Sequence, residues 1–476
     1  MSDCCTPEAG RAGSYDLAVV GAGSAGFSAA ITAAEKGARV ALVGHGTIGG
    51  TCVNVGCVPS KTMIRAAEAL HAGRAASRFA GLVGEAHLTD WTDLIAAKDD
   101  LVAGLRQKKY VDLIAAYDGI NYLDGVARLS GAGLALNGDT LKAGSIVLAT
   151  GASPAGADIP GLERTPYLTS TTALELTELP RSLLVVGGGY IGCELAQMFA
   201  RMGTQVTLVT RDRLLPGAEP EISAALTGNL RDDGITVRTG LAYRRIGLAE
   251  GGVTLEIETG GRQDVIAAAQ VLIATGRRPN TAELGLPEAD VTLTPTGAIV
   301  VDDRMRTSRP RVYAAGDVTG RDQFVYMAAH GAKIAALNAL DGDCLRYDDS
   351  AVPWVVFTDP QVAGVGLSEA AARVAGHRVK ISVLPLDQLP RALAARDTRG
   401  LIKLVADADS DRLLGAQILA PEGADSIQTA VLAIRHGMTA AALGETIFPY
   451  LTTVEGLKLA AQGFERDVAK LSCCAG

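Results

Sequence analysis

The chain has 476 residues, of which 48% are hydrophobic and 20% charged, and its formal net charge is −8. This length exceeds one hydrophobic core and predicts about three domains, and the acidic balance without a basic block argues against nucleic acid as a main partner. No apolar leader segment precedes Tyr15 and no apolar run reaches membrane-spanning length, so we expect a cytoplasmic, reducing location.

The N-terminal part of the chain predicts a βαβ motif that binds a dinucleotide. Residues 16–20 are typical of a buried parallel strand, residues 27–36 of a helix, and residues 39–43 of the next strand. Glycines between the first strand and the helix let the backbone approach a pyrophosphate, whose charge is held by N–H groups at the helix start. The loop residues in question are Gly21, Gly23, Ser24 and Gly26.

This first motif lacks one residue that such a site usually has. An acidic side chain that binds a ribose hydroxyl is expected about twenty residues after the loop. At that place the chain reads Val43-Gly44-His45. Either another group holds the ribose, or the dinucleotide binds less tightly.

The motif recurs further along the chain. A strand beginning at Leu183 is followed by a helix that ends at Met202 and by a strand at residues 205–209. Two such motifs point to two nucleotides, a flavin and a nicotinamide. Arg211 and Arg213 stand where an NAD site has an acidic residue, which favours NADPH because a guanidinium binds phosphate oxygens. The second loop and helix start carry Gly187, Gly189, Tyr190, Ile191 and Gly192.

Two cysteines follow the first motif in the segment Gly49-Gly-Thr-Cys52-Val-Asn-Val-Gly-Cys57-Val-Pro-Ser-Lys61. We expect one turn of helix to bring the sulfurs of Cys52 and Cys57 within disulfide reach, and a helix N-terminus to favour the thiolate form. In a reducing compartment, a close cysteine pair is more often catalytic, redox-active or metal-binding than structural.

The cysteine segment resembles the active-site signature of the flavoprotein disulfide reductases, the family of glutathione reductase and dihydrolipoamide dehydrogenase. The resemblance implies that Cys57 lies against the flavin of FAD and that Cys52 is the outer interchange thiol. It also implies that Lys61 approaches the flavin N5 and pairs with Glu194, and that Tyr190 covers the nicotinamide pocket.

The resemblance covers nearly the whole chain from Tyr15 and implies an α/β fold. Two Rossmann-like dinucleotide-binding domains, as in glutathione reductase, would be followed by an α+β dimerisation domain, so that a homodimer shares its active sites. We expect an FAD-binding domain at 14–150, an NADPH-binding domain at 151–275, a second FAD-binding or central part at 276–345, and a dimerisation domain with its tail at 350–476. Further cofactor contacts implied by the family's motifs are Gly50, Thr51, Thr150, Gly151, Gly276, Arg277, Gly316 and Asp317.

The resemblance breaks at one position near the C-terminus. Disulfide reductases carry a His-Pro-Thr-x-x-Glu motif, whose histidine, from the partner subunit, shuttles a proton to the leaving thiol. Here the matching stretch retains Glu455 but has Tyr450 in place of the histidine. A phenol is a poor proton shuttle at neutral pH, so protonating a leaving thiolate is not the expected task of this chain.

The vicinal pair Cys473-Cys474 in the tail suggests another task. Thiolates are preferred ligands of soft metals, and Hg(II) can pass from one dithiol to the next through three-coordinate exchange. The pattern resembles the mercury-reducing members of the family, which implies that Cys473 and Cys474 of the partner subunit deliver Hg(II) to Cys52 and Cys57. It also implies that Tyr110 joins Tyr450 at the metal.

The resulting hypothesis is NADPH-dependent reduction of Hg(II) to Hg(0) through FAD, a mercury detoxification. Two alternatives stay open: an NAD(P)H-dependent disulfide reductase, against which Tyr450 counts, and a metal-sequestering protein without turnover, against which the two nucleotide sites count. Only about fourteen residues precede the first strand, so the N-terminal metal-binding module that many mercury-reducing relatives carry is expected to be missing. Cys4 and Cys5 either scavenge metal or do nothing, and Cys193 and Cys344 are expected to be buried or incidental.

Overall fold

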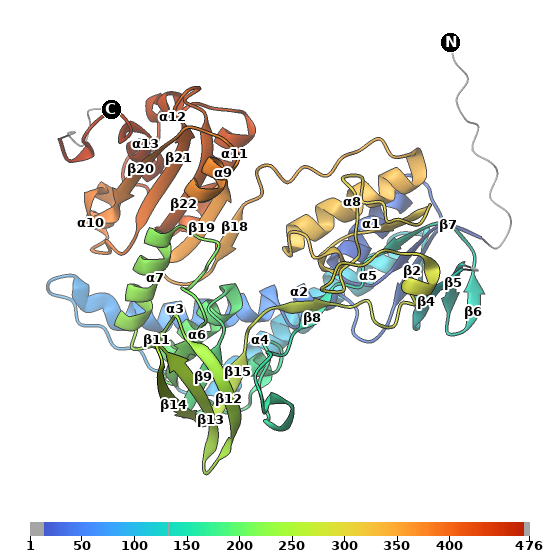
Figure 1. Ribbon diagram of the computed structural model, residues 1–476, viewed down its shortest axis with the longest axis horizontal. Coiled ribbons are helices and arrows are strands. Elements are labelled where there is room, and N and C mark those ends of the chain that lie inside the picture. The colour runs from blue at the N-terminus through green and yellow to red at the C-terminus, as the bar shows by residue number, and fades with distance from the viewer. Residues whose placement is uncertain (1–13, 132, 471–476) are drawn as a thin grey trace. The chain divides into compact units, whose positions relative to one another are not determined.

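The computed structural model describes residues 14–131 and 133–470 (Figure 1). Cys4, Cys5, Cys473 and Cys474 therefore lie outside the described residues. The chain divides into two compact units, each assembled from separate stretches. The first unit comprises Met1–Pro59, Ala96–Pro154 and Arg277–Asp348, and the second comprises Ser60–Ile95, Ala155–Gly276 and Asp349–Gly476.

The first unit is built on a five-stranded parallel sheet with the strand order β17-β7-β1-β2-β3. Its central strands are almost entirely buried, as expected for a parallel sheet that is covered on both faces. Helix α1 (Ser24–Glu35) lies against α8 (Val325–Asp341), where Ser28 Oγ donates to the Ala329 carbonyl at 2.8 Å. The strands are β1 (Tyr15–Val20), β2 (Val40–Gly44), β3 (Ile120–Asp124), β7 (Ala143–Leu148) and β17 (Val312–Ala314).

Smaller elements complete the first unit. A three-stranded antiparallel sheet contains β4 (Ala127–Ser130), β5 (Gly133–Leu136) and β6 (Asp139–Leu141), and β8 (Ala152–Pro154) pairs with β16 (Arg277–Pro279). The short helices are α2 (Gly50–Asn54) and α5 (Asp112–Ala115). Two longer helices, α3 (Cys57–Arg74) and α4 (Trp91–Arg106), each begin in one unit and end in the other.

The second unit contains the repeat of the βαβ motif. Its four-stranded parallel sheet has the order β11-β10-β9-β15. The strands are β9 (Ser182–Val186), β10 (Gln205–Val209), β11 (Thr236–Arg238) and β15 (Gln270–Ile273). Helices α6 (Tyr190–Met202) and α7 (Pro220–Asp232) accompany an antiparallel sheet of β12 (Ala242–Ala249), β13 (Gly252–Thr259) and β14 (Arg262–Ala268).

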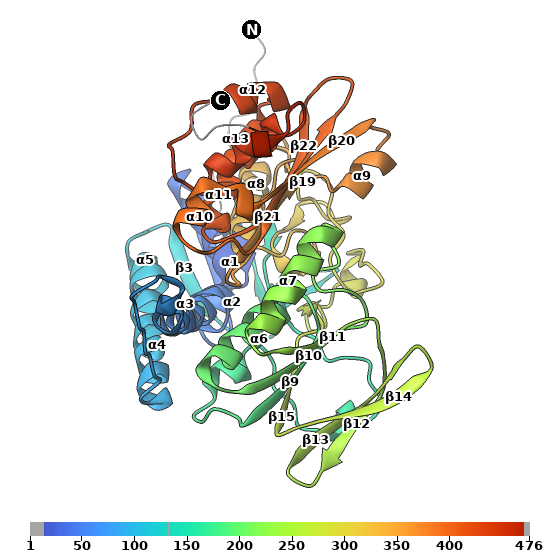
Figure 2. The same cartoon turned by 90° about the vertical axis from the view of Figure 1, so that its left-hand side faces the viewer.

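The C-terminal part of the second unit is an antiparallel sheet with helices, of strand order β18-β19-β22-β21-β20. Helix α11 (Gly423–Arg435) contacts β19 and β22, and α13 (Glu455–Gln462) contacts β20 and β21 (Figure 2). The strands are β18 (Trp354–Val356), β19 (Gln361–Gly366), β20 (Val379–Pro385), β21 (Leu401–Asp407) and β22 (Leu413–Ala420). The remaining helices are α9 (Glu369–Val374), α10 (Pro390–Ala394) and α12 (Ala440–Glu445).

A buried cation ties the nucleotide half of the second unit to its C-terminal sheet. The Lys403 Nζ, from β21, lies 3.0 Å from carboxylate oxygens of Glu219, Glu221 and Glu369. The Lys403 side chain is 1% exposed, so the three carboxylates supply the compensation that a buried ammonium group needs.

The predicted fold class is confirmed. Two parallel sheets with glycine loops are present, and the C-terminal part combines an antiparallel sheet with helices. Two predicted boundaries differ from the structure. Helix α1 begins at Ser24, earlier than the predicted residue 27, because the last residues of the glycine loop already form its first turn. Strand β2 begins at Val40 and extends to Gly44, whereas residues 39–43 were predicted.

Within the described part of the chain, no helix combines the length and the apolar character needed to cross a membrane.

Candidate redox and nucleotide sites

The first glycine loop has the geometry of a phosphate cradle. Gly21 has φ +118°, and a Cβ atom there would lie 2.2 Å from the Ala149 carbonyl oxygen. A Cβ atom at Gly26 would lie 1.7 Å from the Gly21 carbonyl oxygen. The N-cap of α1 is Gly23, which has no side chain to satisfy the first N–H groups of the helix. The loop therefore fits the pyrophosphate of a dinucleotide, which accepts these N–H groups as donors.

The second loop repeats this arrangement in the other unit. Gly187 has φ +123°, and its Cβ atom would lie 2.3 Å from the Ala274 carbonyl oxygen. A Cβ atom at Gly192 would lie 1.8 Å from the Gly187 carbonyl oxygen, while nothing crowds Gly189 at the start of α6. The same close approaches at both loops support two dinucleotide sites.

The two arginines after β10 have different surroundings. Arg213 Nη2 donates to the Pro216 and Ala218 carbonyls, both at 2.8 Å, so its guanidinium is engaged with the backbone. Arg211 is exposed, with its guanidinium carbon 5.1 Å from the centre of the Tyr243 ring and an N–H donated to the Asp158 carbonyl at 3.2 Å. Of the two, Arg211 is therefore the more exposed and the less engaged with the backbone.

Cys52 and Cys57, the predicted redox pair, lie on two helices and not on one helical turn, which corrects the predicted local geometry. Cys52 is in α2, and Cys57 is the first residue of α3. A turn at Val55 and Gly56 separates the helices, and it requires glycine at position 56 because a Cβ atom there would lie 2.8 Å from the Thr51 carbonyl oxygen. The predicted helix N-terminus is present at Cys57, and the positive end of a helix dipole favours a negatively charged group there.

The start of α2 is hydrogen-bonded to the first phosphate loop and packs closely against it. Gly49 N–H donates to the Ala22 carbonyl at 2.9 Å, and a Cβ atom at Gly50 would lie 2.6 Å from Gly23 Cα. Thr51 is exposed at the following position. The cysteine segment thus has its position set by the same backbone that would hold the flavin pyrophosphate.

Asn54 and Arg106 are positioning residues that sequence reasoning missed. Asn54 Nδ2 donates to the Ile48 and Gly50 carbonyls, both at 2.9 Å, which closes the loop before Cys52. Arg106 Nη1 donates to Asn54 Oδ1 at 3.1 Å. The place of Asn54 between the two cysteines is a sequence signal that could have revealed it. Arg106 lies 52 positions from Asn54 in the chain, and no sequence signal pointed to it.

Tyr110 lies beside the cysteine pair, in a π-helical turn at Gln107–Val111 that follows α4. Its ring packs edge-on against Phe27 with centroids 4.9 Å apart, and its Oη lies 3.4 Å from Ser24 Oγ. Burial raises the pKa of Tyr110 above its ordinary value, and the charges of Cys52 and Cys57 act in the same direction. The phenol therefore stays protonated at neutral pH, as a neutral donor within electrostatic range of the two cysteines.

Lys61 and Glu194 form the predicted pair in the second unit. Lys61 Nζ lies 2.7 Å from Glu194 Oε2, and Glu194 Oε1 accepts the Phe357 N–H at 2.8 Å. The Glu194 side chain is 5% exposed, and the ammonium group also lies 4.9 Å from the centre of the Phe357 ring. Lys61 lies one turn after Cys57 on α3.

Tyr190 begins α6 and stacks at a tilt against Trp354, with ring centroids 5.7 Å apart. Burial raises the pKa of Tyr190 to about 12, so its hydroxyl is neutral over the physiological range. Ile191 follows in the same helix turn. Trp354 was not predicted, because its contact with Tyr190 joins segments far apart in the sequence.

Thr150, Gly151 and Gly276, which were predicted to contact the cofactors, have backbone or side-chain hydrogen bonds within their own units. Thr150 Oγ1 donates to the Asn280 carbonyl at 2.7 Å, and Asn280 N–H donates to the Gly151 carbonyl at 3.0 Å. In the second unit, Ala155 N–H donates to the Gly276 carbonyl at 3.0 Å.

Asp317 follows β17 at the start of a short 3₁₀ turn, Asp317–Thr319. Its carboxylate lies 3.6 Å from Arg277 Nε, and Arg277 also donates to the Ala152 carbonyl. Burial raises the pKa of Asp317 above its ordinary value, against the lowering effect of Arg277. Gly316 has φ +78°, and its Cβ atom would lie 3.1 Å from Ala25 Cβ, so the turn lies close to the start of α1.

Tyr450 is half-exposed on a turn that Glu455 braces. Glu455 is buried at the start of α13, and its Oε2 accepts the Leu451 N–H at 3.1 Å, where Leu451 has φ +62°. Thr452 Oγ1 donates to the Pro449 carbonyl at 2.8 Å in the same turn. Glu455 thus holds the backbone that carries Tyr450.

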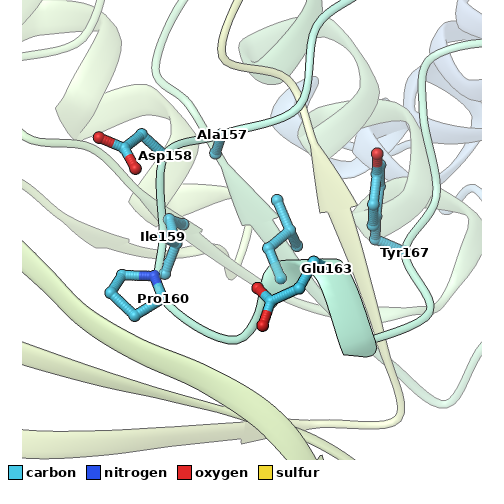
Figure 3. Close-up of a pocket in the computed structure, with 7 residues that line it drawn as sticks. Ala157, Asp158, Ile159, Pro160, Glu163 and Tyr167 are labelled. Atoms are coloured by element: carbon cyan, nitrogen blue, oxygen red, sulfur yellow. The ribbon is translucent and has the colours of Figure 1, made fainter.

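The remaining described cysteines have different surroundings. Cys193 is completely buried in α6, which raises the pKa of its thiol, while Cys344 is exposed. Within residues 14–131 and 133–470, no three or more His, Cys, Asp or Glu side chains gather in a metal-binding cluster. A separate pocket of about 350 Å³ in the second unit contains none of the predicted site residues (Figure 3). It is lined by Ala157, Asp158, Ile159, Pro160, Leu162, Glu163 and Tyr167.

Comparison with known proteins agrees with this geometry. The family model described as pyridine nucleotide-disulphide oxidoreductase matches residues 15–335, and the dimerisation domain of that family matches residues 352–461. The chain belongs to the pyridine nucleotide-disulphide oxidoreductase family. Membership makes the protein a flavoprotein oxidoreductase and implies FAD and NAD(P)H as its cofactors.

Several members of the family are similar over almost the full chain. The mercuric reductase of Staphylococcus aureus is 47% identical over 468 residues, which are 98% of this chain and 85% of that protein. The mercuric reductase of Streptomyces lividans is 47% identical over 468 residues, which are 97% of this chain and 98% of that protein. The HOCl-induced flavoprotein disulfide reductase RclA from Escherichia coli has a TM-score of 0.82 and 32% identity, and the match covers 94% of this chain and 99% of RclA. The resemblance found in the sequence is therefore confirmed.

Exchanging Glu194 for glutamine should slow reduction of the flavin by NADPH. The amide can still accept the Phe357 N–H but loses the charge that pairs with Lys61, a loss of about 1.5 kcal/mol or roughly tenfold in rate. Stopped-flow measurement of flavin bleaching checks this result. Glu68→Gln, which removes a 2.5 Å pair with Arg65 on the same helix, is the matched control and should leave the rate unchanged. Equal rates in wild type and Glu194→Gln would remove Glu194 from the redox site.

Proposed function

We propose that this protein reduces Hg(II) to Hg(0) with electrons from NADPH passed through FAD, as a mercury detoxification. The observation that carries the proposal is the surroundings of the cysteine pair: the protonated phenol of Tyr110 lies within electrostatic range of Cys52 and Cys57, and Cys57 stands at the start of α3. The position of the family's proton-shuttling histidine is occupied by Tyr450. Two thiolates with neutral phenols suit a soft cation better than a leaving thiol that must be protonated.

The cofactors would be held by residues already described. The loops at Gly21 and Gly187 would receive the pyrophosphates of FAD and NADPH, and Asp317 would bind the ribitol chain of FAD. When bound, FAD supplies two-electron transfer between NADPH and the substrate. Tyr190 would cover the nicotinamide pocket, and Lys61 would hold a positive charge near the flavin.

Cysteine thiolates would bind Hg(II) at each step, from its capture to its reduction. Cys473 and Cys474 of the partner subunit would capture Hg(II) from its thiol complexes and pass it to Cys52 and Cys57 by ligand exchange, each incoming sulfur replacing an outgoing one. Tyr110 and Tyr450 of the partner subunit would steady the ion. The overall balance is Hg(II) plus NADPH giving Hg(0), NADP⁺ and one proton. The neutral atom then leaves because it has little affinity for thiolate.

The arrangement of subunits and domains belongs to the same proposal. The match of residues 352–461 to a dimerisation domain supports a homodimer, and shared active sites are part of the proposal. A cytoplasmic location and the boundaries 14–150, 151–275, 276–345 and 350–476 remain predictions.

One assay separates the proposed function from its rival. With purified protein and excess thiol, NADPH oxidation should depend on added Hg(II) and release volatile mercury. Oxidised glutathione or lipoamide should support at most about a hundredth of that rate, since Tyr450 replaces the general acid–base group. A faster reaction with either disulfide and no mercury requirement would establish a disulfide reductase instead. Mercury binding without NADPH oxidation would indicate sequestration.

Exchanging Cys473 and Cys474 for alanine should impair delivery and not electron transfer. We expect turnover with thiol-complexed Hg(II) to fall by about tenfold or more, because the incoming metal loses its first pair of ligands. Flavin reduction by NADPH in the same variant should stay at the wild-type rate. Cys344→Ala is the control for loss of an exposed thiol. An equal decrease in both rates would refute the delivery role.

Exchanging Arg211 for alanine should weaken NADPH selectively. Loss of a guanidinium–phosphate contact is expected to raise KM for NADPH by about tenfold to a hundredfold and to leave KM for NADH unchanged. Arg213→Ala is the matched control: its guanidinium bonds the Pro216 and Ala218 carbonyls, so it should lower thermal stability without changing the NADPH/NADH ratio. Steady-state kinetics with both nucleotides checks the pair of outcomes, and a greater loss of preference in Arg213→Ala would reverse the assignment.

A further inference from the structure

The end of strand β2 has no acidic residue, although this is the place where a βαβ dinucleotide site usually binds a ribose hydroxyl. Gly44 is the last residue of β2 and is paired in register with Asp124, the last residue of β3. Gly44 is not among the residues with positive φ, so its backbone does not require glycine. The reason for glycine at this position must therefore be space.

The space above Gly44 is occupied by a phenol. A Cβ atom at Gly44 would lie 2.5 Å from Tyr122 Oη and 2.7 Å from Tyr122 Cε2. It would also lie 2.8 Å from the Cβ atom of Ala22, which belongs to the phosphate loop between Gly21 and Gly23. Tyr122 comes from β3, where it is paired with Leu42, and its hydroxyl thus reaches the carboxyl ends of the strands next to the phosphate loop.

The chemistry of this hydroxyl suits a ribose. Tyr122 is half-buried and Asp124 is exposed. Burial and the negative charge of Asp124 raise the pKa of Tyr122, so the phenol stays protonated. Because Tyr122 and Asp124 are two positions apart on one strand, their side chains lie on the same face. Together they offer one donor and one charged acceptor, which is what a sugar hydroxyl needs.

We propose that Tyr122, together with Asp124, replaces the missing acidic residue of β2 and binds the adenosine ribose of FAD. The dinucleotide is then held from the third strand of the sheet and not from the second. Gly44 is the necessary counterpart, since any side chain there would displace the phenol. This inference concerns the flavin site and not the metal substrate. If the mercury assay failed, the inference about Tyr122 would still hold. If the inference about Tyr122 failed, the proposed mercury reaction would still hold.

Flavin affinity tests the proposal directly. In the full-length protein, bound flavin is exchanged against known concentrations of FAD or FMN, and the fluorescence of the released flavin gives Kd. Tyr122→Phe should weaken FAD about fivefold to tenfold, the effect of one lost hydrogen bond, and should leave FMN unchanged because FMN has no adenosine ribose. Asp124→Asn should act in the same direction. Tyr117→Phe, which loses only a 3.4 Å contact with Glu35, is the matched control.

A compensating exchange guards against a merely structural effect. Gly44→Glu alone should weaken FAD strongly, because its side chain and the Tyr122 phenol compete for one space. Gly44→Glu combined with Tyr122→Ala should bind FAD more tightly than Tyr122→Ala alone, since the carboxylate then takes over the ribose. The proposal is overturned if Tyr122→Phe binds FAD as well as wild type, if FMN weakens equally, or if the double variant binds FAD no better than Tyr122→Ala.

Discussion

A single buried carboxylate connects the parts of the second unit on which the redox chemistry depends. Glu194 follows the second glycine loop on α6, and it accepts both the Lys61 ammonium group and the Phe357 N–H. An ionised group at 5% exposure is tolerated only with such partners, so three distant segments must meet at one place. Lys61 lies on α3, the helix that begins at Cys57.

In the first unit, close backbone contacts have the corresponding role. The phosphate loop receives the start of α2 against Gly23, and Asn54 closes the segment before Cys52. A side chain at Gly21, Gly26 or Gly50 would meet backbone atoms at less than van der Waals distance, so the cradle and the cysteine segment constrain each other. Pyrophosphate binding and thiol placement are therefore consequences of one packing arrangement, and not of two independent motifs.

Two tyrosines set this chain apart from the disulfide reductases: the protonated Tyr110, and Tyr450 at the position of the family's proton-shuttling histidine. Burial keeps Tyr110 protonated beside Cys52 and Cys57, and Tyr450 stands on a turn that Glu455 braces. Such groups can donate a hydrogen bond without competing for the proton of a thiolate at neutral pH. A protonated phenol has a similar part in the proposal for Tyr122. There it would take over the role of a carboxylate and bind a sugar hydroxyl.

The sequence by itself determined the fold class, the family and the two nucleotide motifs, because glycine spacing, cysteine spacing and strand periodicity are local properties of the chain. It also predicted the Lys61–Glu194 pair through the family resemblance, although the roles of the individual site residues remain predictions. Only the tertiary structure decided that Arg213 is engaged with backbone carbonyls, that the cysteines lie on two helices, and that Tyr122 fills the space above Gly44. These features depend on which distant side chain reaches a given volume, and no local pattern encodes that.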